Sequence, residues 1–182
     1  SHPMSHPAVS PEALQGAITT IRESLDSASR GLPEDLFLLV SSLTPMINVD
    51  LLIKDSAGRN LLTWRHDCFY GPGWHLPGGI IRFKESIGSR IAAVALSELG
   101  VEVDFEPVPI HMAEITHPTR DTRGHFISLL YACTLRITLD EAGRFKPDAP
   151  RAGDWQWHIG APHDLILQHR IYNRFLEASC PA

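Results

Sequence analysis

Hydrophobic residues recur at the spacing of one helix face near the start of the chain. Leu14, Ile18 and Ile21 follow this spacing. They come after Ser10-Pro11-Glu12, which combines a helix-capping serine, a first-turn proline and an acid at the positive helix end. The pattern predicts an amphipathic helix over residues 11–29.

A second helix is predicted over residues 33–43, where the sequence is more evenly apolar. Pro45 ends it, because proline lacks the backbone N–H that a continuing helix requires. The two helices form an N-terminal extension, residues 11–44, ahead of a domain that is complete without it. An apolar stripe needs a partner, so we expect the extension to pack on the domain or on a second subunit, in a homodimer.

From Asn48 onward the hydrophobic period changes to two. Residues 48–54 and 60–65 are predicted strands, joined in a hairpin, and a helix is predicted over residues 86–99. The other predicted elements are strands around 103–115 and 125–137, a short strand at 154–158 and a helix near 162–178. Mixed strands around a central helix indicate an α+β fold, an α/β/α sandwich with a mixed sheet, over residues 45–179.

Composition and charge narrow the function. The chain has 182 residues, of which 43% are hydrophobic and 20% charged, as in an ordinary globular domain with an appendage. Its 16 basic and 21 acidic residues give a net charge of −5, which excludes the basic field of a nucleic-acid-binding protein. An anionic substrate must therefore be held locally, by a few placed cations or a metal.

Cysteine usage and the chain start bear on the cellular setting. Three cysteines, an odd number without a closely spaced pair, argue against a disulfide framework or a structural zinc site, so we expect a reducing cytoplasm. No apolar run approaches the roughly 20 residues that a membrane span needs. The start SHPMSHP is typical of a cloning remnant, and we expect residues 1–10 to be disordered.

One acid of the predicted helix 86–99 lies on its apolar side. At about 100° per residue, Glu98 falls on the face that carries Ile91 and Val94. A carboxylate among apolar side chains is costly unless it is paired or binds a metal. An ion pair with Arg65 or Arg82 is one alternative, and metal ligation is the other.

The double glycine ahead of this helix favours metal ligation. Glycines let the backbone approach a ligand closely. A free backbone carbonyl in the stretch PGG can then join the Glu98 carboxylate around a hard divalent cation. The two features together indicate a site for a metal and a phosphate.

These features resemble the Nudix box, in which a glycine is followed by five residues, a glutamate, seven residues and a cluster of charged residues that ends in glycine and an apolar residue. The matching residues are Gly79, Glu85, Glu98, Gly100 and Val101. The stretch also follows predicted strands and a W-x-x-P-G-G loop, as in that family. The resemblance implies a Nudix-type sandwich and a hydrolase.

The cluster departs from the box at three positions. Ala93 stands in place of arginine, Val94 in place of glutamate and Ser97 in place of the first of two paired glutamates. A box reduced to one acid before Leu-Gly resembles the branch of GDP-mannose mannosyl hydrolase, and the resemblance covers about residues 45–158. It implies hydrolysis of a nucleotide sugar at the sugar carbon, with one Mg²⁺ or Mn²⁺.

Position by position, the resemblance implies a role for several residues. Glu98 and the backbone carbonyl of Gly78 would bind the metal, with Glu85 of the box as a further ligand. Arg65 would stabilise the leaving diphosphate, so Arg65 and Glu98 are the candidate catalytic residues. Asp50, in the first strand, would help to seat the substrate, although it could also be an acid that pairs with a nearby lysine.

Two parts of the branch pattern do not carry over. Ile80 stands where the branch has an arginine, and Arg82 is the candidate to bind substrate in its place. Arg151 and Ala152 stand where the branch has a metal ligand and a general base, so the base is unidentified. The candidates for a replacement base are His125, Asp148, Asp154 and Glu114.

Two loops add candidate substrate contacts. Trp74 flanks a Gly-Pro-Gly turn, where its ring either stacks on a nucleobase or pins the loop to the core. The loop 117–125 carries two arginines and ends at His125, and it is either a phosphate or sugar site or a solvated hairpin tip.

Two functions follow from these residues. The first is a hydrolase of a nucleotide sugar or a related nucleoside diphosphate derivative, dependent on a divalent metal. The second is a Nudix-fold module that binds a nucleotide sugar with little or no turnover. The missing box residues and base favour the module, whereas the retained Glu98 and Arg65 favour the hydrolase, which is our prediction. Its partners are small molecules, and neither nucleic acid nor membrane.

Overall fold

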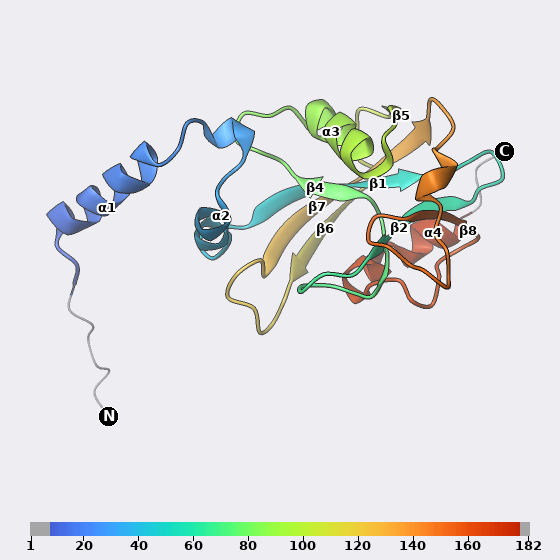
Figure 1. Ribbon diagram of the computed structural model, residues 1–182. Helices are drawn as coiled ribbons and strands as arrows, with labels where there is room; N and C mark the ends of the chain where they lie inside the picture. Colours follow the sequence, from blue (N-terminus) through green and yellow to red (C-terminus); the bar gives the residue numbers. More distant parts are fainter. Residues whose placement is uncertain (1–7, 179–182) are drawn as a thin grey trace.

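Two β-sheets form the centre of the fold in the computed structural model, which describes residues 8–178 (Figure 1). The larger, five-stranded sheet has the order β4-β1-β7-β5, with β6 also paired to β7. Its strands are β1 (Met46–Ile53), β4 (Gly78–Ile80), β5 (Val103–Phe105), β6 (His111–Thr116) and β7 (His125–Leu135). The smaller sheet has the order β3-β2-β8, with β2 (Asn60–Arg65), β3 (Gly73–His75) and β8 (Trp155–His158). Strands β1 and β7 are parallel and the other pairs of the larger sheet are antiparallel, so the predicted mixed sheet is confirmed.

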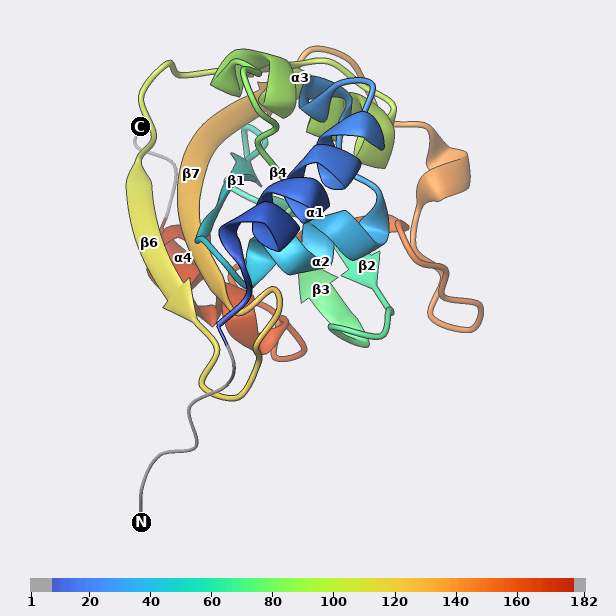
Figure 2. The same cartoon turned by 90° about the vertical axis from the view of Figure 1, so that its left-hand side faces the viewer.

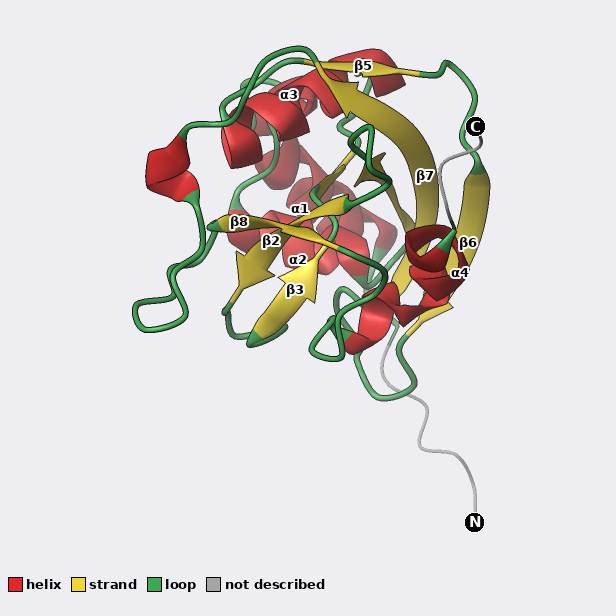
Figure 3. Cartoon of the chain, turned by 90° about the vertical axis from the view of Figure 1, so that its right-hand side faces the viewer, coloured by secondary structure: helices red, strands yellow, loops and turns green. Residues whose placement is uncertain are grey.

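Helices cover both faces of the larger sheet (Figures 1 and 3). The α-helices are α1 (Pro11–Glu23), α2 (Glu34–Ser41), α3 (Ile87–Leu99) and α4 (Asn173–Glu177), and the 3-10 helices are η1 (Ala28–Arg30), η2 (Glu141–Gly143) and η3 (Leu167–Tyr172). Helix α3 packs on one face, and η3 and α4 lie on the other, which confirms the predicted α+β sandwich. In the described part of the chain, no helix is long and apolar enough to cross a membrane.

The predicted hairpin of the first two strands is correct at its turn, where the Asp55 backbone N–H donates to the Arg59 carbonyl, but the strands do not pair beyond it. Strands β1 and β2 lie in different sheets and are linked at an isolated bridge between Lys54 and Asn60. Both edges of β1 are already occupied, because it pairs with β4 and β7. The Asn60 amide donates to the carbonyls of Gly160 and Leu176, at 3.1 and 2.9 Å, which ties β2 to the C-terminal segment instead.

The predicted strand over 103–115 is two strands, β5 and β6. Pro107 and Pro109 lie between them, and a proline has no N–H to donate to a neighbouring strand. Strand β7 pairs with both, so it is the central strand of this part of the sheet.

Two predicted helices are shorter than expected. Helix α1 ends at Glu23, and Ser27 then caps the separate η1. In place of one helix over 162–178, η3 and α4 follow an extended segment in which Leu165 bridges to Trp74. That bridge uses backbone groups which a helix would bond internally.

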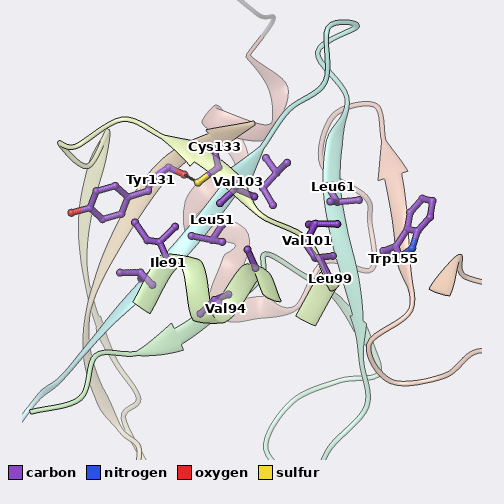
Figure 4. Packing of buried hydrophobic residues seen from close by; sticks show 13 residues of the cluster. Leu51, Leu61, Ile91, Val94, Leu99, Val101, Val103, Tyr131, Cys133 and Trp155 are labelled. Carbon is purple, nitrogen blue, oxygen red and sulfur yellow. Dashed lines mark hydrogen bonds between the residues drawn. The ribbon is translucent and has the colours of Figure 1, made fainter. Parts of the chain in front are cut away.

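The main core lies between α3 and the larger sheet (Figure 4). Successive side chains of a strand point to opposite faces, so Val49 and Leu51 of β1 face α3. Helix α3 contributes Ile91 and Val94 to the same core, as its predicted apolar face requires. Asp50 lies between Val49 and Leu51 and therefore points to the opposite side of the sheet.

The helical extension, which consists of α1, η1 and α2, lies at one end of the sheets (Figure 2). Helix α2 contacts the domain, where Ser41 Oγ accepts a hydrogen bond of 2.9 Å from the Arg123 backbone N–H. Helix α1 has no buried residue and extends away from the sheets in Figure 1. Leu14 of its apolar stripe is 56% exposed. The domain therefore contacts α2, whereas the apolar stripe of α1 stays exposed to solvent.

We propose that α1 covers this stripe against a second copy of the chain. Replacing Ile18 and Ile21 by aspartate should convert a dimer into a monomer in analytical ultracentrifugation, because the apolar contact is lost. Gln15→Asp, at an exposed position of the same helix, is the matched control and should leave the dimer intact. Sedimentation of the unaltered protein as a monomer would contradict the proposal.

Candidate active site

A cleft of about 850 Å³ is lined by residues of both sheets, α3 and the helical extension. Its volume lies within the range of roughly 300–1,000 Å³ that is usual for small-molecule sites. Five of the predicted site residues line it, namely Asp50, Arg65, Gly78, Arg82 and Glu98. It also contains His75 and His169, to which the sequence had assigned no role.

Glu98 lies in the last turn of α3 and faces this cleft. Its side chain is 27% exposed, and its Oε2 lies 3.9 Å from His75 Nε2. Desolvation raises the pKa of the Glu98 carboxyl to about 7, although a hydrogen bond from the Gly78 backbone and the charge of Arg65 act in the opposite direction. Within residues 8–178, Glu98 forms no ion pair with an arginine, so the alternative of a buried pair with Arg65 or Arg82 is not what the structure contains. The Glu98 carboxylate thus has no arginine at ion-pair distance, and Arg65 acts on it only from further away.

His75 lies beside Glu98 as a neutral ring. Its Nδ1 lies 2.9 Å from the Thr63 carbonyl oxygen, which only accepts, so Nδ1 carries the proton. Nε2 is then the acceptor nitrogen, and it lies 3.5 Å from Thr63 Oγ1 and 3.9 Å from Glu98 Oε2. Desolvation, with contributions from His169 and Arg65, lowers the pKa of His75 to about 3. His75 therefore adds a nitrogen donor beside Glu98 but no positive charge.

Asp50 is buried on the other wall of the cleft. The Tyr172 hydroxyl donates to its Oδ2 at 2.6 Å, and the Asn48 amide donates to its Oδ1 at 3.2 Å. Burial outweighs these hydrogen bonds and raises the pKa of Asp50 to about 6. The alternative partner, Lys54, directly follows β1 and instead donates to Asn60 Oδ1 at 2.6 Å. Asp50 is thus an oriented acid within the cleft.

His169 and Tyr172 complete this wall, and no local pattern in the sequence indicated either. The Leu76 backbone N–H donates to His169 Nδ1 at 3.0 Å, so the proton is on Nε2, which lies 3.8 Å from Asp50 Oδ1. Desolvation lowers the pKa of His169 to about 3, so this ring is neutral too. Both residues belong to η3, more than a hundred positions along the chain from Asp50.

The double glycine lets β4 approach both β1 and α3. A Cβ added at Gly78 would lie 2.3 Å from Asp50 Oδ1 and 2.7 Å from the Val49 carbonyl oxygen. One added at Gly79 would lie 2.8 Å from a methyl carbon of Val94. Any side chain at either position would therefore push β4 away from the two acids.

Arg65 and Glu85, two further predicted site residues, each form an ion pair with a neighbouring side chain. Arg65 forms an ion pair with Asp67 and lies over the Tyr70 ring, 4.4 Å from its centroid, at the side of the cleft. Glu85 is not among the residues that line the cleft. Both of its oxygens bind Arg90, at 2.6 and 2.9 Å, which lowers the Glu85 pKa. Its predicted role as a metal ligand would require this pair to open.

Two predicted substrate contacts are corrected by the structure. Trp74 is 3% exposed and packs in a second core against Trp64 and Phe145, so it pins its loop and has no free face for a nucleobase. His125 does not line the cleft, although Phe126 next to it does, because neighbouring residues of β7 point to opposite faces.

The candidate replacement bases also lie elsewhere. His125 Nε2 and Glu114 Oε1 are 3.7 Å apart, outside the residues that line the cleft. Asp154 is buried. Its carboxylate accepts a hydrogen bond from the Arg151 backbone N–H and forms an ion pair with the Arg151 side chain. Asp148 is exposed in a loop. The acids that do line the cleft are Asp50, Asp67 and Glu98.

The donor set suits a single divalent ion. Among the residues that the structure describes, no group of three or more His, Cys, Asp or Glu side chains is arranged to hold a metal. The Glu98 carboxylate and His75 Nε2 offer two donors, and a desolvated carboxylate without an arginine or lysine at ion-pair distance favours a cation. Ions of this kind commonly take their other ligands from substrate phosphates and water. The site therefore fits an ion that binds together with a diphosphate.

Known proteins were compared with this chain. No family model matches the sequence. The low-salt glycan biosynthesis protein Agl8 of Haloferax volcanii is 28% identical over 120 residues, which cover 66% of this chain and 76% of that protein. A MutT NUDIX hydrolase of Burkholderia pseudomallei superposes with a TM-score of 0.56 and 19% identity, over 72% of this chain and 97% of the other. A UDP-X diphosphatase superposes with a TM-score of 0.53 and 17% identity, over 91% and 77%.

These likenesses establish the fold. The chain has the fold of the Nudix hydrolases, as the box-like stretch around Gly79 and Glu98 predicted. At such identities the substrate and the reaction have to be argued from the residues of the cleft.

The raised pKa of Glu98 predicts how stability depends on pH in metal-free buffer. Between its ordinary value of 4.5 and about 7, the folded protein binds more protons at Glu98 than the unfolded chain, so the unfolding free energy should fall as pH rises. Glu98→Gln should remove this loss and stabilise the protein at about pH 8 by on the order of 2 kcal/mol, with little effect near pH 4.5.

Urea denaturation with EDTA across that pH range measures this difference. Glu114→Gln, at an exposed acid outside the cleft, is the control and should follow the unaltered protein. Equal pH dependence in all three proteins would show that Glu98 ionises without a penalty.

Proposed function

We propose that the protein is a divalent-metal-dependent hydrolase of a nucleotide sugar or a related nucleoside diphosphate derivative. The observation that carries the proposal is the desolvated carboxylate of Glu98, which shares one cleft with Arg65 and with the tightly packed glycines of β4. The Nudix fold supports it, as do a relative named for glycan biosynthesis and a structural neighbour named as a UDP-X diphosphatase.

Glu98 is the residue to hold the ion, with His75 Nε2 beside it as a second donor. We assign the Gly78 carbonyl as a further ligand of this ion, because the Gly78 backbone is hydrogen-bonded to Glu98 and therefore lies beside it. When bound, a Mg²⁺ or Mn²⁺ ion supplies positive charge that neutralises a diphosphate. The nitrogen donor of His75 suits Mn²⁺ better than Mg²⁺, which prefers oxygen.

Arg65 stabilises the leaving group. Its guanidinium is oriented by Asp67 and by the Tyr70 ring, and it lines the cleft on the side of β2. A fixed guanidinium donates to phosphate oxygens in pairs and strengthens as negative charge develops on them.

Asp50 accepts the proton from the attacking water. Of the acids that line the cleft, Glu98 is assigned to the ion and Asp67 is paired with Arg65, which leaves Asp50. Its pKa of about 6 suits a base that works near neutral pH, and Tyr172 and Asn48 fix its orientation. This assignment replaces the base that the sequence had left open.

Water then attacks the anomeric carbon of the sugar. The bond from this carbon to the diphosphate oxygen breaks, its electron pair leaves with the diphosphate, and the water proton goes to Asp50. Attack on phosphorus commonly uses two metals to stabilise the attacking and leaving oxygens. Val94 is a buried core residue and Ser97 carries no charge, so α3 offers no acid besides Glu98 for a second ion.

A second candidate function is a module that binds a nucleotide sugar without turnover. The observation in its favour is the small donor set, since no three metal-ligating side chains meet in the described part of the chain. The module would share the cleft, the ion and Arg65 with the hydrolase, but Asp50 would have no part in chemistry.

Substitutions of Glu98 and Asp50 should both lower turnover, but only the substitution of Glu98 should abolish metal binding. Mn²⁺ added with inorganic pyrophosphate should raise the melting temperature by mass action, and Glu98→Gln should abolish this rise and reduce turnover about a hundredfold or more. Asp50→Asn should keep the rise but lower turnover by about a hundredfold or more, because only the proton acceptor is lost.

Glu114→Gln again serves as the control and should match the unaltered protein in both measurements. Metal-dependent turnover that Glu98→Gln leaves unchanged would exclude Glu98 as the ligand. Nucleotide-sugar binding without turnover in the unaltered protein would select the binding module.

The bond that breaks can be identified in ¹⁸O-labelled water. With a panel of nucleotide sugars and Mg²⁺ or Mn²⁺, we expect the label in the free sugar and an unlabelled nucleoside diphosphate, read by mass spectrometry. The reason is that one cation and one arginine are enough for a diphosphate that leaves as a unit. Label in a nucleoside monophosphate or a sugar phosphate would mean attack on phosphorus and would refute this assignment.

A further inference from the structure

Two arginines line the part of the cleft that the helical extension covers. Arg82 follows β4, and Arg123 lies at the end of the loop between β6 and β7. Both line the cleft together with Gly31 and Phe37 of the extension. Neither guanidinium forms an ion pair with a residue in the range 8–178, in a chain whose net charge is −5. The mechanism above uses neither of them.

Arg123 is held rigidly while its hydrogen-bond donors stay unused. Its guanidinium carbon lies 4.6 Å from the ring centroid of Phe69 and 5.4 Å from that of Phe37. Its backbone has a φ of 52°, in the left-handed region, and is fastened to α2 by the hydrogen bond to Ser41. Its Nε–H is buried and has no hydrogen-bond partner among the described residues. A buried donor of this kind is unfavourable until an acceptor reaches it.

Arg82 adds a second positive charge at the rim of the same region. Its guanidinium passes beside Gly31, where an added Cβ would lie 3.4 Å from the guanidinium carbon. The acids that line the cleft form no ion pair with either arginine: Asp67 is paired with Arg65, Asp50 is bonded to Tyr172, and Glu98 lies beside His75. Outside the lining, Glu85 accepts a hydrogen bond from the Arg82 backbone N–H and interacts with the Arg82 charge, but both of its oxygens bind Arg90. The cleft lining also includes several apolar residues, namely Leu32, Val40, Met46, Ile81, Ile115 and Phe126.

We propose that Arg123 and Arg82 form a second oxyanion subsite, which receives an anionic group of the substrate beyond the diphosphate. A guanidinium that rests on aromatic rings presents its N–H edge to a ligand, and this edge matches carboxylate and phosphate oxygens. The substrate class is therefore a nucleotide sugar with an additional charge, either the carboxylate of a sugar acid or a further phosphate. The identity of the substrate rests on the proposed function, whereas the subsite itself does not.

The subsite can be tested without any nucleotide. The Nε–H signals of the arginines are resolved by ¹H–¹⁵N NMR and assigned with Arg123→Gln and Arg82→Gln. Titration with inorganic phosphate should shift the Arg123 and Arg82 signals along one saturable curve and leave Arg136, an exposed arginine paired on the opposite part of the sheet, unchanged. An Arg123 signal that does not move would overturn the subsite.

Pairs of ligands that differ by one charged group test which kind of group the subsite binds. Isothermal titration calorimetry in EDTA, where turnover stops, compares UDP-glucose with UDP-glucuronate, and ADP-ribose with its 2′-phosphate. In at least one pair, the more charged ligand should bind about tenfold tighter, and Arg123→Gln should remove this gain. Arg82→Gln, which leaves the strained loop position untouched, should reduce the gain in part, and Arg136→Gln should preserve it.

The outcomes separate the two proposals. A phosphate response at Arg123, without any binding of the four ligands either in EDTA or with Mn²⁺ present, would support the subsite and refute the proposed nucleotide-sugar function. Equal affinity within both pairs, or a gain that survives both variants, would overturn the assignment of a charged substrate.

Discussion

The close approach of β4 to β1 is the constraint on which the cleft depends. Gly78 lies opposite Asp50 in the strand register, so near that the smallest side chain would collide with the carboxylate. Gly79 has the same relation to Val94 of α3. Because β4 can lie between these two elements, its backbone reaches Glu98 on one side and Asp50 on the other. The two acids thus share one cleft although they belong to different layers of the fold.

Charge in this cleft is arranged to leave the acids without a permanent counter-ion. His75 and His169 face Glu98 and Asp50, but burial keeps both rings neutral. Desolvation by burial, which outweighs the charge of Arg65, raises the pKa of Glu98 to about 7 and that of Asp50 to about 6. A protein interior tolerates such groups where a proton or a cation completes them during function. This is the physical reason to regard a box with few acids as a working site and not as a remnant.

The helical extension is part of the cleft and not merely an appendage to it. Residues of η1 and α2 line the cleft, and Ser41 fastens the loop that carries Arg123. The superposition on the UDP-X diphosphatase covers 91% of this chain, more than the domain alone, whereas that on the MutT hydrolase covers 72%. The lining at this end of the cleft therefore comes from the extension as well as from the domain, while Asp50 and Glu98 belong to the domain.

Local sequence patterns were sufficient to predict those elements whose conformation is set by residues close to them in the chain. The helix predicted over residues 86–99 is α3, and the helical spacing of Ile91 and Val94 placed Glu98 on an apolar face, where a carboxylate is costly unless it is paired or binds a metal. The glycine-and-acid stretch indicated the Nudix fold. These are short-range properties, set by the helix period and by the steric freedom of glycine.

Only the tertiary structure decided which strands pair and which distant side chains meet. The first two strands separate into different sheets because β7, far along the chain, competes for the edge of β1. Tyr172 reaches Asp50 across more than a hundred residues, and Arg123 lines the cleft on a loop that is hydrogen-bonded to Ser41 of α2. A sequence pattern indicates whether a residue prefers to be buried or exposed. Which strand or side chain it contacts is decided by long-range packing, because several strand pairings are compatible with the same local pattern.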